Sequence, residues 1–291
     1  EQLNFLNKLI KNKKFLDQYL IDEIEKISNE LDEKKYHRRT KIIIADEDQE
    51  EISFEEFVQI DKLTIAVFKD DSIKSFKDHI DIDSLTSNQK DIIDAHHIMS
   101  NQKLLIFSSS GRIFTIDPNL LPSGKANAKN FIYYVDSSLN DKLVKLIPYV
   151  DNLKCIVASS FGKGFLADLN NILTTQKKEK QLFNLKNNDQ LIKVIIANKT
   201  HLACVNKDQK LLIFEVKELP TLQRGGGVQL QKIKDNNTLI DIQNFNPKDG
   251  ISWKTGSLNK NEKNISFWFG KRSQSGKKIP KRFNKNLKFY D

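Results

Sequence analysis

The sequence predicts a mostly β, propeller-like fold of about five blades, preceded by a short α-helical segment. Two observations carry this prediction: a strand hairpin that recurs along the chain, and an amphipathic helical pattern near the N-terminus. The hairpin is clearest where an apolar run, Leu202–Val205, meets the polar turn Asn206–Gln209 and a second apolar run, Leu211–Val216. Apolar runs rich in β-branched and aromatic residues on either side of turn residues indicate two paired strands.

Stop and turn residues follow this hairpin and lead into a third apolar segment. Leu219-Pro220 ends the second run, a glycine cluster occupies 225–227, and Val228–Ile233 then alternates apolar with polar residues. Alternation is typical of a strand with one face in the core and the other in solvent. We therefore expect a half-buried strand over 228–233.

The same order of parts recurs through the chain. Hairpin patterns begin at residues 63, 104, 155, 202 and 251, at intervals of 41, 51, 47 and 49 residues. The fifth copy is the most divergent and would pair Ile251–Trp253 with Ile265–Phe269. A period of roughly 20–50 residues with strands in every unit indicates blades arranged around an axis. The alternative is an ordinary β-sandwich whose hairpins resemble one another by chance.

The N-terminal residues follow a helical pattern instead. Residues 1–10 and 15–34 are predicted to be two helices separated by a polar gap, and the second has an apolar stripe at spacings of three and four: Leu16, Leu20, Ile24, Ile27 and Leu31. Such a stripe usually faces a core or a partner helix. An acidic run, 46–51, then indicates a solvated linker. These features divide the chain into a helical segment (1–40), an acidic linker (41–60) and a β domain (61–291).

Charge is distributed unevenly along the 291 residues. Residues 1–60 contain 10 Lys/Arg and 15 Asp/Glu, whereas residues 61–291 contain 37 and 23, so the β domain carries a net charge of +14. From Lys254 to Lys288 there are 11 basic residues and one acidic residue, Glu262. A basic face attracts polyanions through phosphate contacts and counterion release. The alternative is a solvated, lysine-rich surface without a ligand.

Cysteine use and hydropathy favour a soluble protein of a reducing compartment. No apolar run approaches the roughly 18 residues that a membrane span requires, and no signal-peptide pattern precedes the first helix. The chain begins at Glu1, which indicates a piece of a longer protein. Cys155 and Cys204 both lie in apolar runs and are expected to be buried thiols, although a disulfide between equivalent blade positions is an alternative.

The sequence contains only incomplete versions of the motifs that bind phosphates, dinucleotides or metal ions. Ser123-Gly124-Lys125 lacks the remaining residues of a phosphate loop, and Phe161–Gly164 lacks the third glycine of a dinucleotide fingerprint. His96-His97 has no partners at metal-ligand spacing, so structural or surface histidines are expected. We predict no catalytic residue, no metal site and no cofactor in these residues.

Several stretches of the sequence match one known protein family in order and spacing. They are Glu23–Thr40, Lys77–Asp83, Ser100–Gln102, Ser109–Arg112, Leu121–Ser123, Phe161–Phe165, Glu218–Pro220 and the basic ending Gly270–Phe283. Together they resemble the C-terminal part of the A-subunit of bacterial DNA topoisomerase IV, and Glu23–Thr40 resembles the end of that family's cleavage core. Asp78 stands where the family usually has glycine.

This resemblance implies a β-pinwheel, a propeller-like ring of blades that exchange strands, whose basic outer rim binds and bends duplex DNA. It implies a non-catalytic domain of a type II topoisomerase that selects DNA for decatenation, relaxation and chromosome segregation. By this resemblance, the catalytic tyrosine is expected upstream of these residues, and ATP and Mg²⁺ are expected with the B-subunit. The expected partners are duplex DNA, the B-subunit of topoisomerase IV, a second copy through the missing core, and a condensin-type protein. The expected location is the cytoplasm at the nucleoid, with the inner-membrane periphery as an alternative.

Candidate phosphate contacts are Lys and Arg residues from every repeat. They are Lys74, Lys77, Arg112, Lys125, Lys129, Lys163, Lys177, Lys178, Lys180, Arg224, Lys232, Lys271, Arg272, Lys277, Lys278, Lys281 and Arg282. A curved row of such cations reads the DNA backbone rather than its bases.

Two other assignments stay open at this point. The C-terminal domain of the gyrase A-subunit has a similar fold but carries a Gln-Arg-Arg-Gly-Gly-Lys-Gly box in its first blade. The nearest segment in this chain, Gln223–Val228, lacks the second Arg and the Lys and lies in the fourth repeat. The other alternative is a propeller-type protein-interaction module without a nucleic acid partner.

Overall fold

The computed structural model contains two compact units, Glu1–Val58 and Gln59–Asp291. The structure describes residues 2–30, 60–135, 140–173, 179–234, 237–256 and 258–290. Residues 41–59 of the predicted acidic linker and the Arg38-Arg39-Thr40 segment lie outside these residues, as do Lys177 and Lys178. None of the helices among the described residues is long and apolar enough to cross a membrane.

The first unit contains two helices, α1 (Gln2–Lys11) and α2 (Lys13–Glu30), close to the predicted bounds. They meet through aromatic side chains, because the ring of Phe5 makes edge-on contacts with Phe15 and Tyr19 at centroid distances of 6.0 and 5.6 Å. No residue of either helix is buried. The apolar stripe of α2 is therefore present as predicted, but its described members are exposed in this structure.

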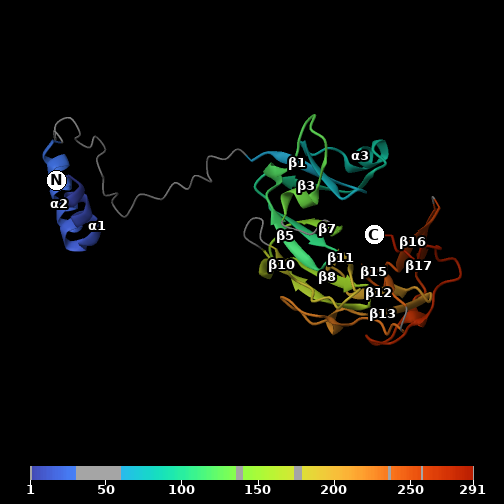
Figure 1. Ribbon diagram of the computed structural model, residues 1–291. Coiled ribbons are helices and arrows are strands. Elements are labelled where there is room, and N and C mark those ends of the chain that lie inside the picture. The colour runs from blue at the N-terminus through green and yellow to red at the C-terminus, as the bar shows by residue number, and fades with distance from the viewer. Residues whose placement is uncertain are drawn as a thin grey trace, which may run out of the picture. The chain divides into compact units, whose positions relative to one another are not determined.

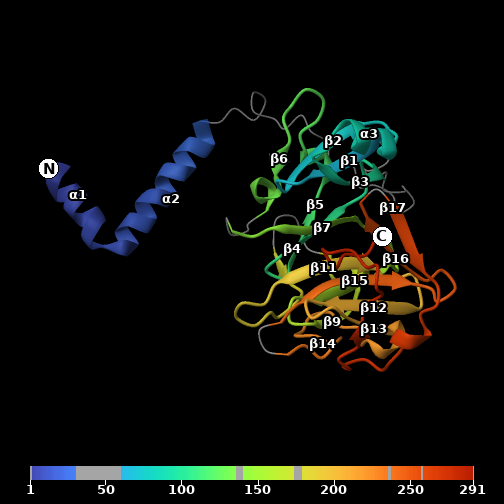
Figure 2. The ribbon, with the colours of Figure 1, turned by 90° about the vertical axis from the view of Figure 1, so that its right-hand side faces the viewer.

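The second unit is built from repeated strand hairpins, which confirms the predicted β fold (Figures 1 and 2). Residues 63, 104, 155 and 202 lie at or beside the starts of four hairpins, and in each hairpin the two strands pair antiparallel. The hairpins are β1 (Lys62–Phe68) with β2 (Ser72–Lys77), β4 (Leu104–Ser108) with β5 (Arg112–Ile116), β8 (Lys154–Ser159) with β9 (Lys163–Asp168), and β12 (His201–Asn206) with β13 (Lys210–Glu215).

A third strand joins the first strand of each hairpin. These strands are β3 (Ile92–Met99), β7 (Leu143–Pro148), β11 (Leu191–Ile196) and β15 (Leu239–Phe245). Consecutive members contact one another in chain order, so they form the inner edge of the ring of sheets. The sequence patterns did not predict these strands.

A fourth, two-residue strand comes from the segment that follows the next hairpin. These exchanged strands are β6 (Lys129–Asn130), β10 (Lys180–Gln181), β14 (Val228–Gln229) and β18 (Lys277–Lys278). They complete the sheet orders β3-β1-β2-β6, β10-β5-β4-β7, β11-β8-β9-β14 and β15-β12-β13-β18, which we call blades 1 to 4. Helix α3 (Ile82–Asn88) lies between β2 and β3 of blade 1. Each exchanged strand lies on the opposite edge of its sheet from the inner strand, which is the outer rim.

The fifth sheet differs from its predicted form. It consists of β16 (Ile251–Thr255) paired with β17 (Leu258–Glu262). The predicted second strand, 265–269, instead contains a 3-10 turn at Ser266–Trp268, in which Ile265 and Trp268 are buried and Ser266 and Phe267 are exposed. A spacing of three between buried residues fits a 3-10 turn rather than a strand, because side chains at i and i+3 eclipse in that geometry.

The predicted strand over 228–233 is also wrong in most of its length. Only Val228 and Gln229 pair as a strand, and both Leu230 and Gln231 are fully buried. The Gln231 amide is buried because its Nε2 donates to the carbonyl oxygens of Lys210 and Ser275, at 3.1 and 2.9 Å. An amide nitrogen with both of its N–H groups bonded can lie in the interior, so the alternation of Gln231 with apolar residues did not mark a solvent-exposed face.

The hydrophobic core lies between adjacent blades. Alternate residues of one strand face opposite neighbours: Leu104 and Ile106 pack with blade 1, whereas Leu105 and Phe107 pack with blade 3. Both faces of the hairpin strands are therefore buried, which explains why they are continuous apolar runs. Further short 3-10 turns connect the blades at Pro118–Leu120, Phe131–Tyr134, Leu169–Asn171 and Val216–Glu218.

Candidate nucleic-acid interface

The exchanged strands place basic residues at one repeated position on the outer rim. Lys129 lies opposite Ile73, Lys180 opposite Ile113 and Lys277 opposite Leu211. These are the same register position in blades 1, 2 and 4, and Val228 occupies it in blade 3. Strand exchange thus turns three lysines that are far apart in sequence into a recurrent feature of the rim.

The strand beside each exchanged strand adds a second set of cations. Arg112, Lys163 and Lys210 are the first residues of β5, β9 and β13, and Ser72 stands at this position in blade 1. Lys210 faces Lys278 directly across the strand pair. We call the two sets, together with Lys278, the rim row: Arg112, Lys129, Lys163, Lys180, Lys210, Lys277 and Lys278. Lys210 was absent from the sequence-based candidates, although its place in the repeat, equivalent to Arg112 and Lys163, identifies it.

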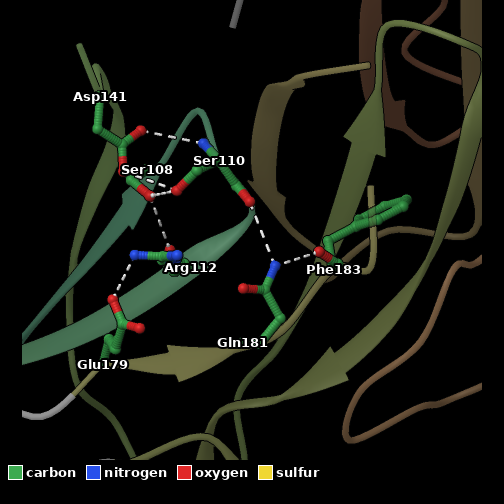
Figure 3. Close-up of polar contacts among 7 residues, drawn as sticks. All are labelled: Ser108, Ser110, Arg112, Asp141, Glu179, Gln181 and Phe183. Carbon is green, nitrogen blue, oxygen red and sulfur yellow. Dashed lines mark hydrogen bonds and ion pairs between the residues drawn. The ribbon is translucent and has the colours of Figure 1, made fainter. Parts of the chain in front are cut away.

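The turn that leads into Arg112 is held by a local polar network (Figure 3). The Asp141 carboxylate accepts hydrogen bonds from the backbone N–H and the hydroxyl of Ser110, at 3.0 and 2.7 Å. From the other side, the Gln181 amide donates to the carbonyl oxygens of Ser110 and Phe183, at 3.2 and 2.6 Å. The start of β5 is therefore fixed by one residue of its own blade and one residue of the exchanged strand.

The same device recurs in blade 3, which shows that it belongs to the repeat. Asp189 accepts from the Ser160 hydroxyl and the Phe161 N–H, at 2.8 and 3.0 Å. Gln229 donates to the carbonyl oxygens of Phe161 and Gly162, at 3.1 and 3.2 Å. The rim cations that follow these turns, Arg112 and Lys163, are thus presented from rigid backbone.

Ion pairing leaves most of the rim row uncompensated. Arg112 pairs with Glu179 at 2.6 Å, and both side chains are partly exposed. Within the described residues, no other member of the rim row forms an ion pair. Lys180 donates to the carbonyl oxygen of Asn171, and the Lys277 ammonium lies 4.5 Å from the centroid of the Phe267 ring. A row of unpaired cations on repeated positions is suited to a polyanion.

The structure places the remaining sequence-based candidates in several different settings. Lys77, Lys125, Lys232, Lys271 and Lys281 are exposed, and Lys74 is half-buried with its ammonium 5.2 Å from the Phe76 ring centroid. None of these occupies a rim-row position.

Two of the predicted arginine contacts are used within the protein. Arg272 is partly buried: its Nη1 donates to the Gln229 carbonyl oxygen at 2.8 Å, and its backbone N–H donates to Glu218 at 2.9 Å. Arg272 thus helps to fix the chain that crosses from blade 4 to the edge of blade 3. Arg224 is exposed, and its Nε donates to the Asn184 side chain at 3.2 Å.

The glycine cluster at 225–227 serves the packing of the rim. The Gly225 N–H donates to the Leu182 carbonyl oxygen, and the Gly225 carbonyl oxygen accepts from Asn184. Gly227 has a φ of +65°, and a Cβ built there would lie 3.0 Å from the backbone of Gly164. Glycine is therefore required at 227 by both its backbone conformation and its close approach to the neighbouring sheet.

Ion pairs also join the inner strands. Asp94 of β3 pairs with Lys145 of β7 at 2.6 Å, and Lys193 of β11 pairs with Asp241 of β15 at 3.3 Å. Although burial raises the pKa of Asp94, hydrogen bonds and charge from His96 and Lys145 outweigh it and hold this pKa below its ordinary value. These pairs connect blade 1 to blade 2 and blade 3 to blade 4 at the ring's inner edge.

Among the described residues, the cysteine and histidine side chains do not gather into a catalytic or metal-binding site. Cys155 and Cys204 are free and buried, which confirms the expected buried thiols. Burial raises the pKa of the Cys155 thiol to about 12 and also raises that of Cys204, so both are protonated at neutral pH. The His97 ring stacks on His79 at 4.5 Å, and among the described residues no group of three or more His, Cys, Asp or Glu could hold a metal ion.

Comparisons with known proteins place this architecture in a family. The model of the DNA gyrase C-terminal domain, described as a β-propeller, matches residues 102–129, 154–198 and 201–246. The DNA topoisomerase 4 A-subunit of Rickettsia bellii is 35% identical over 238 residues, covering 80% of this chain and 32% of the relative. That of Rickettsia prowazekii is 32% identical over 296 residues, covering 99% of this chain and 40% of the relative.

A solved structure decides the fold. The E. coli ParC C-terminal domain superposes with a TM-score of 0.66 at 21% identity, covering 77% of this chain and 96% of that domain. The pinwheel belongs to the C-terminal domains of the topoisomerase IV A-subunit. The family prediction made from the ordered motifs is thereby confirmed. The chain spans about a third of the length of the R. bellii relative.

Proposed function

We propose that the pinwheel domain binds duplex DNA along the rim row and bends it modestly. The observation that carries this proposal is the recurrence of cations at equivalent positions of the exchanged strands and their neighbours. Contacts made by such residues go to phosphates, so binding is expected to tolerate any sequence. Bending a few tens of base pairs costs on the order of 1–6 kcal/mol, which several phosphate contacts offset.

We also propose a role for the domain in the whole enzyme, which its family membership supports. It holds and selects duplex DNA for decatenation and relaxation, while strand cleavage and ATP hydrolysis belong to parts of the enzyme that this chain does not contain. We propose that residues 1–40 are the end of the breakage-reunion core, followed by a linker at 41–60. The proposed partners are duplex DNA, the B-subunit of topoisomerase IV, a second copy through the core, and a condensin-type protein in the bacterial cytoplasm.

The first test measures DNA affinity over a series of salt concentrations. If the rim row neutralises about 4–6 phosphates, log affinity falls against log salt with a slope of about −4 to −5. A flat response to salt contradicts the proposal and favours a protein-interaction module.

A matched pair of variants locates the contact. The rim variant replaces Lys129, Lys163 and Lys277 with Gln. The control variant replaces Lys62, Lys103 and Lys154 with Gln, three exposed lysines at or just before the starts of β1, β4 and β8. Both lower the net charge equally, so the general attraction to DNA changes equally. We expect the slope to shrink by about 2–3 only in the rim variant, since each lost phosphate contact removes about 0.9. Equal changes in both variants place the DNA elsewhere on the molecule.

A further inference from the structure

A second strongly basic feature lies apart from the rim row, on the fifth sheet. A concavity of about 1000 Å³ is lined by residues near the tip of the β16–β17 hairpin and by the C-terminal segment 282–290. Five of its lining residues are cationic, and none is acidic: Lys254, Lys260, Arg282, Lys285 and Lys288. Ligand sites in proteins typically have volumes of about 300–1,000 Å³, so the concavity is large enough for a small polyanion or for part of a larger one.

The wall that carries three of these cations is fixed by specific contacts. The Asn284 side chain donates to the carbonyl oxygens of Lys254 and Lys288, at 3.0 and 2.6 Å, and accepts from the Lys288 N–H at 2.9 Å. The indole N–H of Trp253 donates to the Arg282 carbonyl oxygen at 3.0 Å. The C-terminal segment is therefore held against β16 at Arg282 and Asn284, and Asn284 also closes the turn onto Lys288.

Aromatic packing beneath the concavity makes this wall rigid. The Phe283 ring lies 4.9 Å from the Trp253 ring and 5.5 Å from the Phe289 ring. The Lys254 ammonium lies 3.9 Å from the centroid of the Tyr290 ring, which fixes its position by a cation–π contact. A cation that is already held in place, as Lys254 is, loses little conformational entropy when a ligand binds.

The cations of the concavity have no counterions among the described residues. None of the five forms an ion pair there; the Lys288 ammonium donates to the Ile240 carbonyl oxygen at 3.1 Å, and the Lys254 ammonium contacts only the Tyr290 ring. The one carboxylate between Lys254 and Lys288 belongs to Glu262, whose Oε1 accepts from the Asn264 N–H. Cations gathered in one concave surface repel one another, and a bound anion relieves that repulsion.

We propose that this concavity is a second phosphate-binding site, distinct from the rim row, that takes a chain of linked phosphates. The chain of phosphates comes either from the backbone of a second DNA segment or from a free polyphosphate. Several lysines and one arginine around a concave wall match several phosphates in succession better than a single carboxylate. The inference does not depend on duplex binding at the rim.

The test uses inorganic tripolyphosphate and the whole chain, with binding measured by calorimetry. The concavity variant replaces Lys254, Lys260 and Lys285 with Gln, and the K62Q/K103Q/K154Q and K129Q/K163Q/K277Q variants serve as charge-matched controls. We expect the concavity variant to bind tripolyphosphate at least tenfold more weakly than either control. Equal affinity in all three overturns the proposal. The single K285Q variant, which changes one exposed turn residue, is expected to show a smaller loss in the same direction.

A second arm identifies the source of the phosphates. The protein is mixed with an immobilised duplex and a fluorescent duplex, and capture of the fluorescent duplex reports bridging. If the concavity variant binds one duplex normally but loses bridging, the site holds a second DNA segment. If it loses tripolyphosphate binding and bridges like the controls, the site serves a free polyphosphate. Failure of DNA binding by the unaltered protein contradicts the rim proposal but leaves the tripolyphosphate result intact.

Discussion

Replacing Gly111 with Ala tests whether the exchanged segments hold the blades together. Gly111 lies in the turn between β4 and β5 with a φ of +77°, and a Cβ built there would be 2.6 Å from the Phe183 carbonyl oxygen. Phe183 belongs to the segment that follows β10, and it is fully buried between blades 2 and 3. The Gly111 carbonyl oxygen also accepts from the N–H groups of Leu182 and Phe183, at 3.0 and 2.9 Å.

The expected loss of stability has two parts. An alanine with positive φ costs about 1–2 kcal/mol. The contact at 2.6 Å involves backbone, so the exchanged segment must shift, and overpacking of this kind costs typically about 1–3 kcal/mol. We therefore expect Gly111→Ala to lower the free energy of unfolding by about 2–5 kcal/mol.

Gly124→Ala provides the matched control. Gly124 has a similar φ of +61°, but no atom lies within 4 Å of a Cβ built there. Only the conformational part, about 1–2 kcal/mol, applies to it. The assay is urea unfolding monitored by circular dichroism. The free energies of unfolding of the two variants are compared with the same dependence on urea concentration (the m value). If both variants lose the same stability, the close approach of the exchanged segment contributes nothing and the reasoning is refuted.

Three further outcomes are expected. Cys155 and Cys204 should not react with a thiol reagent in the folded protein and should both react after unfolding, because burial keeps them protonated; rapid reaction in the native state contradicts this. Asp94→Asn should destabilise the protein by about 1–3 kcal/mol at pH 7. Since the folded-state pKa of Asp94 is lowered from 3.8, this difference should shrink as the pH falls below that value and through the lowered pKa; a difference that stays constant as the pH falls argues against the ion pair. Ligation of nicked plasmid with the protein present should leave the linking number nearly unchanged, and a strong positive shift that grows with protein would instead indicate gyrase-type wrapping.

The strand hairpins were predictable because both of their strands are local. Each hairpin joins two apolar runs through a short polar turn, so the signal for both strands lies within about fifteen residues. The apolar runs are continuous because both faces of each strand pack against neighbouring blades. The inner strands are apolar too, as in Leu191–Ile196. Each of them pairs with the first strand of its hairpin, so the second strand of the hairpin lies between the two partners in the sequence. Because no short turn connects an inner strand to its partner, the local sequence does not show which strand it pairs with.

The basic character of the β domain was predictable, but the positions that its cations share in the repeat were not. Basic composition indicated a polyanion-binding face, yet the sequence does not show which lysines share a position in the repeat. The two-residue strands that set this position, such as Lys180–Gln181, are too short to produce any periodicity. Their register depends on pairing with the previous blade, and that pairing brings Lys210 and Lys278 together across 68 residues of chain. Conversely, Arg272 looked like a surface cation and is instead a partly buried hydrogen-bond donor.

Strand exchange also constrains the order in which the domain can form during synthesis. The sheet that begins at Lys62 is completed only when Lys129–Asn130 has left the ribosome, after the whole of the next hairpin. Each sheet therefore keeps one edge unpaired during synthesis, until the exchanged strand that follows the next hairpin has been made. The order of emergence supplies the correct partner to each waiting edge, since the matching segment is the first one available. The same rule means that removing the last blade also removes β18, and so opens the sheet before it.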